Sequence, residues 1–375
     1  LIDGRYKIIE KLNKRAINFP ILTRLASYYI DKRRLSDARK VLEKLIPLIK
    51  IKIRESDGAY VLDESMAKFS NQKPVYDETL YQYGRLQTIN MDFVRALWAL
   101  SNAVGLNPSN AKAYNLMGEI YYTTDESPQA KRMAIALFEA AQRIAPAYYK
   151  PYVNLGHLYF YNDLAFKDEE AALFRALGYY QVAYQLYQMG QVDKLSPDPK
   201  LFYNLSWLYY KYGNYEEALK VLSEIYTTDP LNPYYSYAIG NVYQKMGIGD
   251  LAEVNYLKAI DYFKDIARRI KYINPDSIRH REVFTQLARA YNNLGVVYFT
   301  AAKQNPKMAQ EYEAKALLYF YEAKNMANKV GLLYPEAEYN IKVVLNKGIR
   351  GRMARLDETL VKRTSLQRIL EELKN

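Results

Sequence analysis

Cationic, amide and aromatic side chains recur at a fixed spacing in this chain of 375 residues. A lysine or arginine stands at Lys112, Lys150, Lys200 and Arg289, and each is followed by an asparagine three or four residues later and by an aromatic residue ten residues later. These spacings place the side chains along one stripe of an α-helix. Aromatic anchors, amides that can bond a ligand's backbone and a positive margin are the chemistry of binding rather than of bond making.

The expected partner-binding groove takes in this stripe and the residues beside it. It comprises Lys112, Asn115, Tyr122, Lys150, Asn154, His157, Phe160, Lys200, Tyr203, Asn204, Trp207, Tyr210, Tyr237 and Asn241. We expect Trp207 to stand between Tyr203 and Tyr210 as the main anchor, with Phe160 facing them. Other residues fill the packing positions, so we expect the stripe to be dispensable for folding. The alternative is that the lysines are ordinary surface residues and that the chain simply favours tyrosine.

No arrangement of residues in the sequence indicates catalysis. The two histidines, His157 and His280, lie far apart, and there is no cysteine, so we expect no metal site and no thiol chemistry. Acidic pairs such as Glu216 and Glu217 are typical of solvated helix faces. We therefore expect neither an enzyme nor a cofactor.

The elements that must position the stripe form an internal repeat. Its clearest copy combines aromatic, small and aliphatic residues with a final proline, at Phe202, Leu205, Ser206, Tyr209, Gly213, Tyr215, Ala218, Leu222 and Pro230. This pattern resembles the tetratricopeptide repeat (TPR), a helix-turn-helix unit of roughly 34 residues. The resemblance implies an all-α, right-handed superhelical solenoid whose first helices line a concave surface, and a function as a scaffold or peptide-binding module.

Small residues recur where the two helices of a unit are expected to cross. Gly84, Gly118, Gly156, Gly240 and Gly295 occupy the same position of the repeat, where a larger side chain would hold the helices apart. The aromatic residues around them are expected to fill the space between neighbouring helices. Most of the 39 tyrosines are therefore predicted to belong to the core.

About seven units can be aligned, and they divide the chain into four parts. Residues 1–52 are predicted to hold an N-terminal helix and the first unit, and residues 53–76 a polar insert that forms a long loop. Residues 77–334 hold six further units, several with insertions. Residues 335–375 hold C-terminal capping and extension helices.

Two segments depart from the repeat. Tyr262 to Arg281 is predicted to extend the second helix of the sixth unit into a basic stretch. A separate helix is predicted from about Met353 to Leu373, with a patchy apolar side that caps the last unit or docks a partner. Its apolar residues keep no steady heptad, so we do not expect a coiled coil.

Composition narrows the class of partner. The net charge of +12 favours an anionic partner, and no apolar run is long enough to span a membrane. We expect a scaffold that binds proteins with acidic and apolar or aromatic segments and assembles them into a multiprotein complex. Bacterial envelope or motility machinery, such as the periplasmic flagellar collar of spirochetes, is one example, and the bacterial periplasm is the expected compartment, with the cytoplasm as the alternative.

Two other functions remain open from the sequence. The basic residues between Lys264 and Arg281 and between Lys342 and Arg368 would suit nucleic acid, whose binding would weaken steeply with salt. The chain could instead be a regulatory TPR module of a larger protein.

Overall fold

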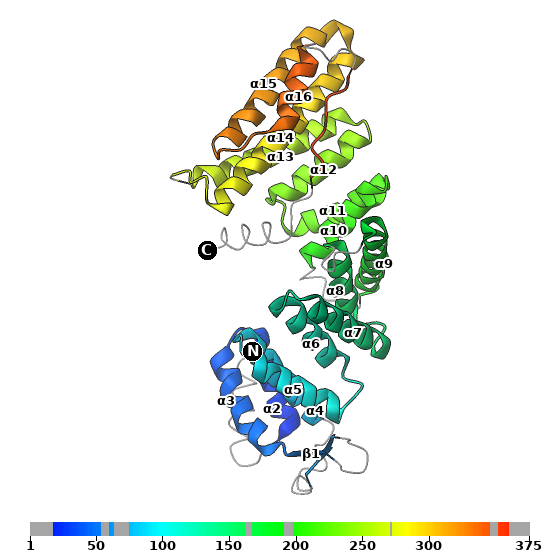
Figure 1. The fold of residues 1–375 in the computed structure, drawn as a ribbon, viewed down its shortest axis with the longest axis vertical. Coiled ribbons are helices and arrows are strands. Elements are labelled where there is room, and N and C mark those ends of the chain that lie inside the picture. Colours follow the sequence, from blue (N-terminus) through cyan, green and yellow to red (C-terminus); the bar gives the residue numbers. More distant parts are fainter. Residues whose placement is uncertain are drawn as a thin grey trace. The chain divides into compact units, whose positions relative to one another are not determined.

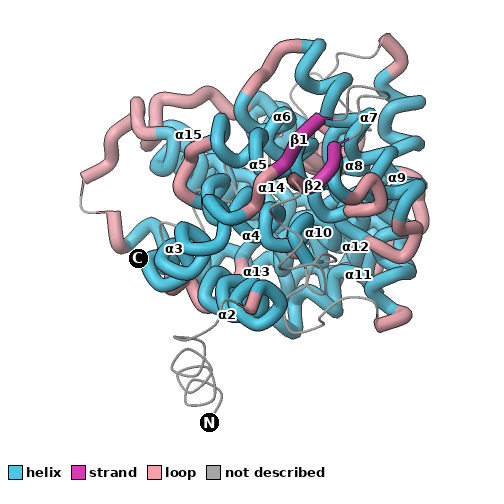
Figure 2. The backbone as a smooth tube through the Cα atoms, turned by 90° about the horizontal axis from the view of Figure 1, so that it is seen from below, coloured by secondary structure: helices cyan, strands magenta, loops and turns pink. Residues whose placement is uncertain are grey.

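The computed structural model describes residues 18–53, 60–63, 75–161, 167–190, 198–270, 272–345 and 352–359. The chain divides into two compact units, Leu1–Leu195 and Ser196–Asn375, which we call the N-terminal unit and the C-terminal unit. Most of the described residues are helical, which confirms the all-α repeat fold (Figures 1 and 2).

The N-terminal unit consists of helices that pack in successive pairs. They are α2 (Phe19–Asp31), α3 (Leu35–Leu45), the 3-10 turn η1 (Ile46–Leu48), α4 (Tyr76–Ile89), α5 (Phe93–Leu106), α6 (Ala111–Thr124), α7 (Pro128–Ile144), α8 (Tyr149–Phe160) and α9 (Glu169–Gln188). The partners are α2 with α3, α4 with α5, α6 with α7 and α8 with α9.

The C-terminal unit continues the same arrangement and ends with one unpaired short helix. Its helices are α10 (Pro199–Lys211), α11 (Tyr215–Thr228), α12 (Pro233–Lys245), α13 (Gly249–Arg268), α14 (Ile278–Gln304), the 3-10 turn η3 (Pro306–Met308), α15 (Ala309–Asn328) and α16 (Pro335–Val344). Helix α16 packs on the last pair, α14 and α15.

Glycines allow the close approach within these pairs, as the sequence predicts. A Cβ atom placed on Gly240 of α12 would lie 2.8 Å from the ring of Tyr256 on α13, and one on Gly295 of α14 would lie 2.6 Å from the ring of Phe320 on α15. Real Cβ contacts are not that short, so any larger residue would force the helices apart. The rings themselves are fully buried.

The sequence also explains where the helices begin and turn. Asp198 and Asn232 cap α10 and α12 with side-chain oxygens that accept from backbone N–H groups, and a proline follows each cap. Gly213 and Gly247 end the turns after these two helices with φ of +78° and +75°, a conformation that favours glycine. The first helices of these two pairs are thereby fixed at both ends.

A short antiparallel ladder, which the sequence analysis missed, spans the start of the predicted insert. Strand β1 (Ile51–Ile53) pairs with β2 (Tyr60–Leu62), with Ile51 opposite Leu62 (Figure 2). Across the described ranges, none of the helices combines the length and the apolar character that crossing a membrane requires.

The structure corrects the predictions for the two irregular segments. Helix α13 ends at Arg268 and α14 begins at Ile278, so the second helix of the sixth unit does not continue to Arg281. Residues 352–359 contain no helix, so the predicted helix from Met353 is wrong over its first residues. The rest of that prediction, residues 360–373, lies outside the described residues.

Candidate functional site

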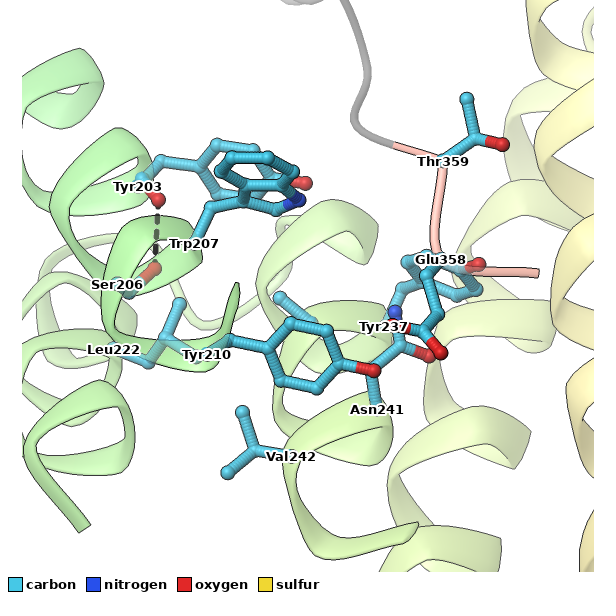
Figure 3. A pocket seen from close by; sticks show the side chains of 11 residues that line it. Tyr203, Ser206, Trp207, Tyr210, Leu222, Tyr237, Asn241, Val242, Glu358 and Thr359 are labelled. Atoms are coloured by element: carbon cyan, nitrogen blue, oxygen red, sulfur yellow. Dashed lines mark hydrogen bonds between the residues drawn. The ribbon is translucent and has the colours of Figure 1, made fainter. Parts of the chain in front are cut away.

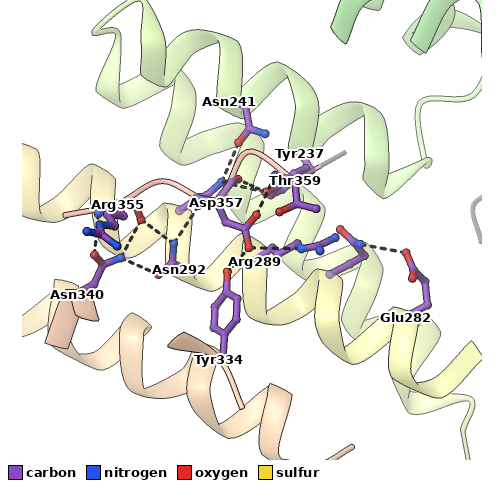
Figure 4. A network of polar contacts seen from close by, with 12 residues as sticks. Tyr237, Asn241, Glu282, Arg289, Asn292, Tyr334, Asn340, Arg355, Asp357 and Thr359 are labelled. Carbon is purple, nitrogen blue, oxygen red and sulfur yellow. Dashed lines mark hydrogen bonds and ion pairs between the residues drawn. The ribbon is translucent and has the colours of Figure 1, made fainter. Parts of the chain in front are cut away.

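Residues 352–359, which we call the tail segment, lie against the first helices of the C-terminal unit (Figure 4). The segment has no regular hydrogen bonds of its own, so its backbone N–H and C=O groups need partners elsewhere. Side chains from α12, α14 and α16 supply them. The contacts concentrate on two alternate residues, Arg355 and Asp357.

The backbone of Arg355 is held by two asparagines. Asn340 of α16 accepts from the Arg355 N–H at 2.7 Å and donates to its carbonyl oxygen at 2.9 Å. Asn292 of α14 donates to the same carbonyl at 3.1 Å, and its own Oδ1 accepts from Asn340 at 2.8 Å. The Asn340 amide therefore bonds to both backbone groups of Arg355, and the Asn292 amide orients the Asn340 amide.

The backbone of Asp357 is held in the same manner. Asn293 of α14 accepts from the Asp357 N–H at 2.8 Å and donates to its carbonyl oxygen at 2.9 Å. Tyr237 of α12 donates to that carbonyl at 2.7 Å. Asn241, one turn along α12, accepts from Asn293 at 2.9 Å and from the Tyr256 hydroxyl at 2.7 Å, which fixes the amide in place.

The carboxylate of Asp357 lies in a buried polar pocket between α14 and α16. The Tyr334 hydroxyl donates to Oδ2 at 2.7 Å, and the Arg289 guanidinium is 3.4 Å from the same oxygen. Asp357 is only 5 % exposed, so its charge depends on these partners. Burial raises the pKa of Tyr334 and of Tyr237, and the Asp357 carboxylate adds to both rises.

The same carboxylate also raises the pKa of Arg289, on which burial acts in the opposite sense. Although burial lowers it, the pKa of the Arg289 guanidinium stays above its ordinary value because Asp357 stabilises the charged form. The site therefore places a cation and a hydroxyl donor against the acidic side chain at this position of an extended chain.

The next residue, Glu358, extends the acidic contact toward α12 and α10. Its carboxylate pairs with Lys245 at 2.5 Å, and burial together with this carboxylate raises the pKa of Tyr210. Beside Glu358 and Thr359 lies a shallow pocket, whose cavity volume is only about 20 Å³ (Figure 3). Its other walls are mainly aromatic and apolar, and they comprise Tyr203, Ser206, Trp207, Tyr210, Leu222, Tyr237, Ala238, Asn241 and Val242.

Apolar and aromatic contacts also hold the tail segment in place. Ala354 and Leu356 pack on a core cluster of α14, α15 and α16 that includes Phe299 and Phe320. The Arg355 guanidinium lies 3.8 Å from the centre of the Tyr339 ring. Apolar residues thus alternate with the two residues whose backbones the amides hold, as an extended chain requires.

The residues predicted from the sequence fall into both units. In the N-terminal unit, Asn154 donates to Asn115 at 3.1 Å and to Glu119 at 3.2 Å, and Asn115 donates to Glu119 at 2.8 Å. Lys112 and Lys150 are exposed, as a groove margin would be.

The predicted aromatic and histidine positions of the N-terminal unit are buried. Tyr122 carries the Lys131 ammonium over its ring, and the carbonyl oxygen of Tyr122 accepts from that ammonium. His157 forms a 2.5 Å hydrogen bond with Tyr180, against which Phe160 also packs.

In the C-terminal unit the structure brings Tyr203, Trp207, Tyr210, Tyr237 and Asn241 together around the pocket (Figure 3). Trp207 is half-buried, and its indole lies beside the Tyr203 ring, while Tyr210 points toward Glu358.

The remaining members of the predicted stripe in this unit lie nearby on α10. Lys200 is half-buried and Asn204 is buried, and neither lines the pocket.

Burial corrects one part of the prediction. The stripe was expected to be dispensable for folding, yet most of its members are buried in their own unit. The buried ones are Asn115, Tyr122, His157, Phe160, Tyr203, Asn204, Tyr210, Tyr237 and Asn241. Trp207 is the aromatic member that keeps substantial exposure. The expected packing of Phe160 toward Trp207 would join the two units, each of which is described by itself.

Several residues of the site lay outside the predicted set. Three of them, Arg289, Asn292 and Asn293, belong to the stripe of cationic and amide residues, so the sequence did carry a signal for them. The expected partner-binding groove, however, ended at Asn241. Asn340 and Tyr334 lie beyond the last repeat, where no register predicts them. The tail segment itself was predicted to be helical.

The basic stretch expected to suit nucleic acid is divided between helices. Lys264 of α13 lies over the Tyr291 ring at 5.5 Å, and Arg268 pairs with Asp265. Arg281 belongs to the start of α14. Within the described ranges, these side chains do not line up along a single helix.

Comparison with known proteins bears on the repeat directly. Residues 199–230, which form α10 and α11, match the family model of the tetratricopeptide repeat. The chain contains a tetratricopeptide repeat. Proteins built from this repeat are in general non-enzymatic scaffolds for protein–protein interaction.

Relatives of this TPR chain share only part of its length or a modest identity. The general transcriptional corepressor ssn6 of Schizosaccharomyces pombe is 29% identical over 154 residues, which is 41% of this chain and 12% of the corepressor. The crystal structure of YrrB, described as a TPR protein with an unusual peptide-binding site, is 22% identical and covers 53% of this chain and 92% of its own, with a TM-score of 0.38. A TPR protein of Parabacteroides merdae is 14% identical, covering 88% of this chain and 99% of its own, with a TM-score of 0.39.

Proposed function

We propose that this TPR chain is a non-enzymatic scaffold that binds an extended peptide segment of a partner protein in the groove formed by α10, α12, α14 and α16. The observation that carries the proposal is the pair of two-way amide contacts, from Asn340 to Arg355 and from Asn293 to Asp357. These contacts read the backbone of alternate residues, which is how a groove recognises an extended chain of varied sequence.

Proteins assembled in this way would meet in a multiprotein complex, because a TPR array offers other faces for further partners. A place in bacterial envelope or motility machinery is expected from composition alone, and the proposal does not depend on it. Acidic and apolar segments are the partner chemistry that the groove supports, through Arg289, Lys245 and the aromatic pocket.

The test uses the full chain with its tail segment displaced. In the variant Asp357→Lys with Glu358→Lys, which we call the open variant, the new ammonium groups face Arg289 and Lys245 and repel the tail segment. Labelled peptides of about ten residues, acidic or neutral, are then titrated in by fluorescence anisotropy. We expect binding, and we expect Asn293→Ala in the open variant to weaken acidic and neutral peptides alike by roughly tenfold, because backbone contacts are lost.

The matched control is Asn255→Ala, which removes a half-buried asparagine of α13 that donates to the Leu251 carbonyl of its own helix. It should leave peptide binding unchanged. A folded open variant that binds no peptide of either kind refutes the proposed function, and far-UV circular dichroism establishes that it is folded.

A further inference from the structure

The proposed groove is already occupied by a segment of its own chain, and this occupant shows what the groove selects. We infer that the partner's peptide carries an Asp-Glu pair followed by an apolar or aromatic side chain, and that the tail segment competes with it for the same amides. The inference rests on the proposed function and names the ligand and the regulation of that site.

The contacts of Asp357 and Glu358 support the acidic pair. One carboxylate is buried against Arg289 and Tyr334, whereas the next is half-exposed and pairs with Lys245. A neutral side chain at the first position would leave the Arg289 guanidinium, whose side chain is 16% exposed, without its counter-charge. The first acid is therefore the stronger requirement, and the second adds charge at the rim.

The aromatic pocket supports an apolar residue after the pair. Glu358 and Thr359 form one of its walls, so the pocket lies beside the position that follows the acidic pair in a bound peptide. The half-buried indole of Trp207 and the rings of Tyr203 and Tyr210 offer an apolar surface to that side chain (Figure 3).

Competition follows from the identity of the contacts. The two-way amide bonds of Asn293 and Asn340 are fully used by the tail segment, so a partner cannot engage them while the tail segment is bound (Figure 4). A tethered segment acts at an effective concentration in the millimolar range. At that effective concentration, a tail segment with an intrinsic dissociation constant of about 100 µM weakens the apparent binding of a competing peptide about tenfold.

The test compares the wild-type chain with the open variant, and its probe is a labelled synthetic peptide with the sequence of residues 352–361. A second probe replaces the aspartate and glutamate by asparagine and glutamine. We expect the acidic probe to bind the open variant about tenfold more tightly than the wild type, and to bind it at least tenfold more tightly than the neutral probe. Trp207→Ala in the open variant should weaken the acidic probe.

The matched control for charge reversal is Asp265→Lys, which changes an exposed acid of α13 paired with Arg268 in the same unit. Its affinity for the acidic probe should equal that of the wild type. Equal affinity of the wild type and the open variant overturns the competition, and equal affinity for the two probes overturns the acidic ligand. Either result leaves peptide binding itself intact, whereas the absence of all binding refutes the proposed function.

Light scattering separates the chain's own tail segment from that of a second copy. A monomeric wild type supports competition within one chain. A wild-type dimer that becomes monomeric in the open variant overturns it, because the tail segment would then be exchanged between copies.

Discussion

In the N-terminal unit the amides of Asn115 and Asn154 bond to Glu119, an acid of the unit's own helix α6, whereas in the C-terminal unit the amide of Asn293 bonds to the tail segment. Both clusters stand on the first helices of their pairs, and both need an acceptor because buried amides must be paired. The N-terminal cluster supplies its own acceptor. The C-terminal cluster also bonds within itself, from Asn293 to Asn241, but it has a further donor and acceptor that bond the backbone of the tail segment.

His157 and Trp207, which occupy the same position of the repeat, show a second contrast. His157 of α8 is buried and bonded to Tyr180, while Trp207 of α10 is half-buried at the edge of a pocket. The same position of the repeat therefore belongs to the core in the N-terminal unit and to the edge of the pocket in the C-terminal unit.

Replacement of these two residues should give the largest difference. His157→Ala should lower the free energy of unfolding of the N-terminal unit by about 3 kcal/mol, because it opens a cavity and removes the buried hydrogen bond between His157 and Tyr180. Trp207→Ala should cost about 1 kcal/mol or less of stability while it weakens peptide binding. Urea denaturation followed by circular dichroism measures the first effect, and anisotropy in the open variant the second. Equal losses of stability would remove the contrast.

The two amide clusters should differ by a smaller amount. Asn293→Ala should destabilise the C-terminal unit by about 2 kcal/mol, because it removes the acceptor of the buried Asp357 N–H and the bonds to Asn241 and to the Asp357 carbonyl. Asn154→Ala should cost below about 1 kcal/mol, since Asn154 is half-buried and Glu119 keeps its bond to Asn115.

The two tryptophans of the chain let each cluster be measured separately. Trp98 lies in the N-terminal unit and Trp207 in the C-terminal unit, so Trp98→Phe leaves a fluorescence probe of the C-terminal unit alone. If Asn154→Ala lowers the free energy of unfolding as much as Asn293→Ala does, the two amide clusters do not differ, and the contrast between them is wrong.

The smallest expected effect depends on pH. Burial raises the pKa of Glu282 above its ordinary value of 4.5, although the bond from Gln286 and the charge of Arg289 both lower it. The folded state therefore binds this proton more tightly than the unfolded state, and the free energy of unfolding falls as pH rises from 4.5 through the raised pKa. Glu282→Gln should remove this slope, a change below about 1 kcal/mol. The exposed Glu313→Gln should retain it, and a slope that persists in Glu282→Gln would exclude Glu282 as its source.

The repeat register was predictable because its packing is local and periodic. Gly240 and Tyr256 stand sixteen positions apart in the sequence and meet in the structure, and the same relation holds for Gly295 and Phe320 at a longer separation. Periodic spacing carries such information directly. It also marked Asn293 as a member of the stripe.

The parts that were missed depend on pairing between distant segments. Residues 352–359 carry helix-compatible residues, yet Asn293 and Asn340 hold them extended through bonds that cross 64 and 15 positions of sequence. The ladder of β1 and β2 likewise depends on a partner strand within a segment whose polar composition indicated a loop. Tertiary contacts of this kind override local propensity and leave no period in the sequence.

The glycines at the helix crossings have a consequence for how this chain can vary. A Cβ atom on Gly240 would lie 2.8 Å from the Tyr256 ring, so the two positions share one volume. Substitution at either position alone should be poorly tolerated, whereas Gly240→Ala combined with a smaller residue at position 256 should restore the fit. Each crossing is thus an epistatic pair, and accepted changes at its two positions should be found together.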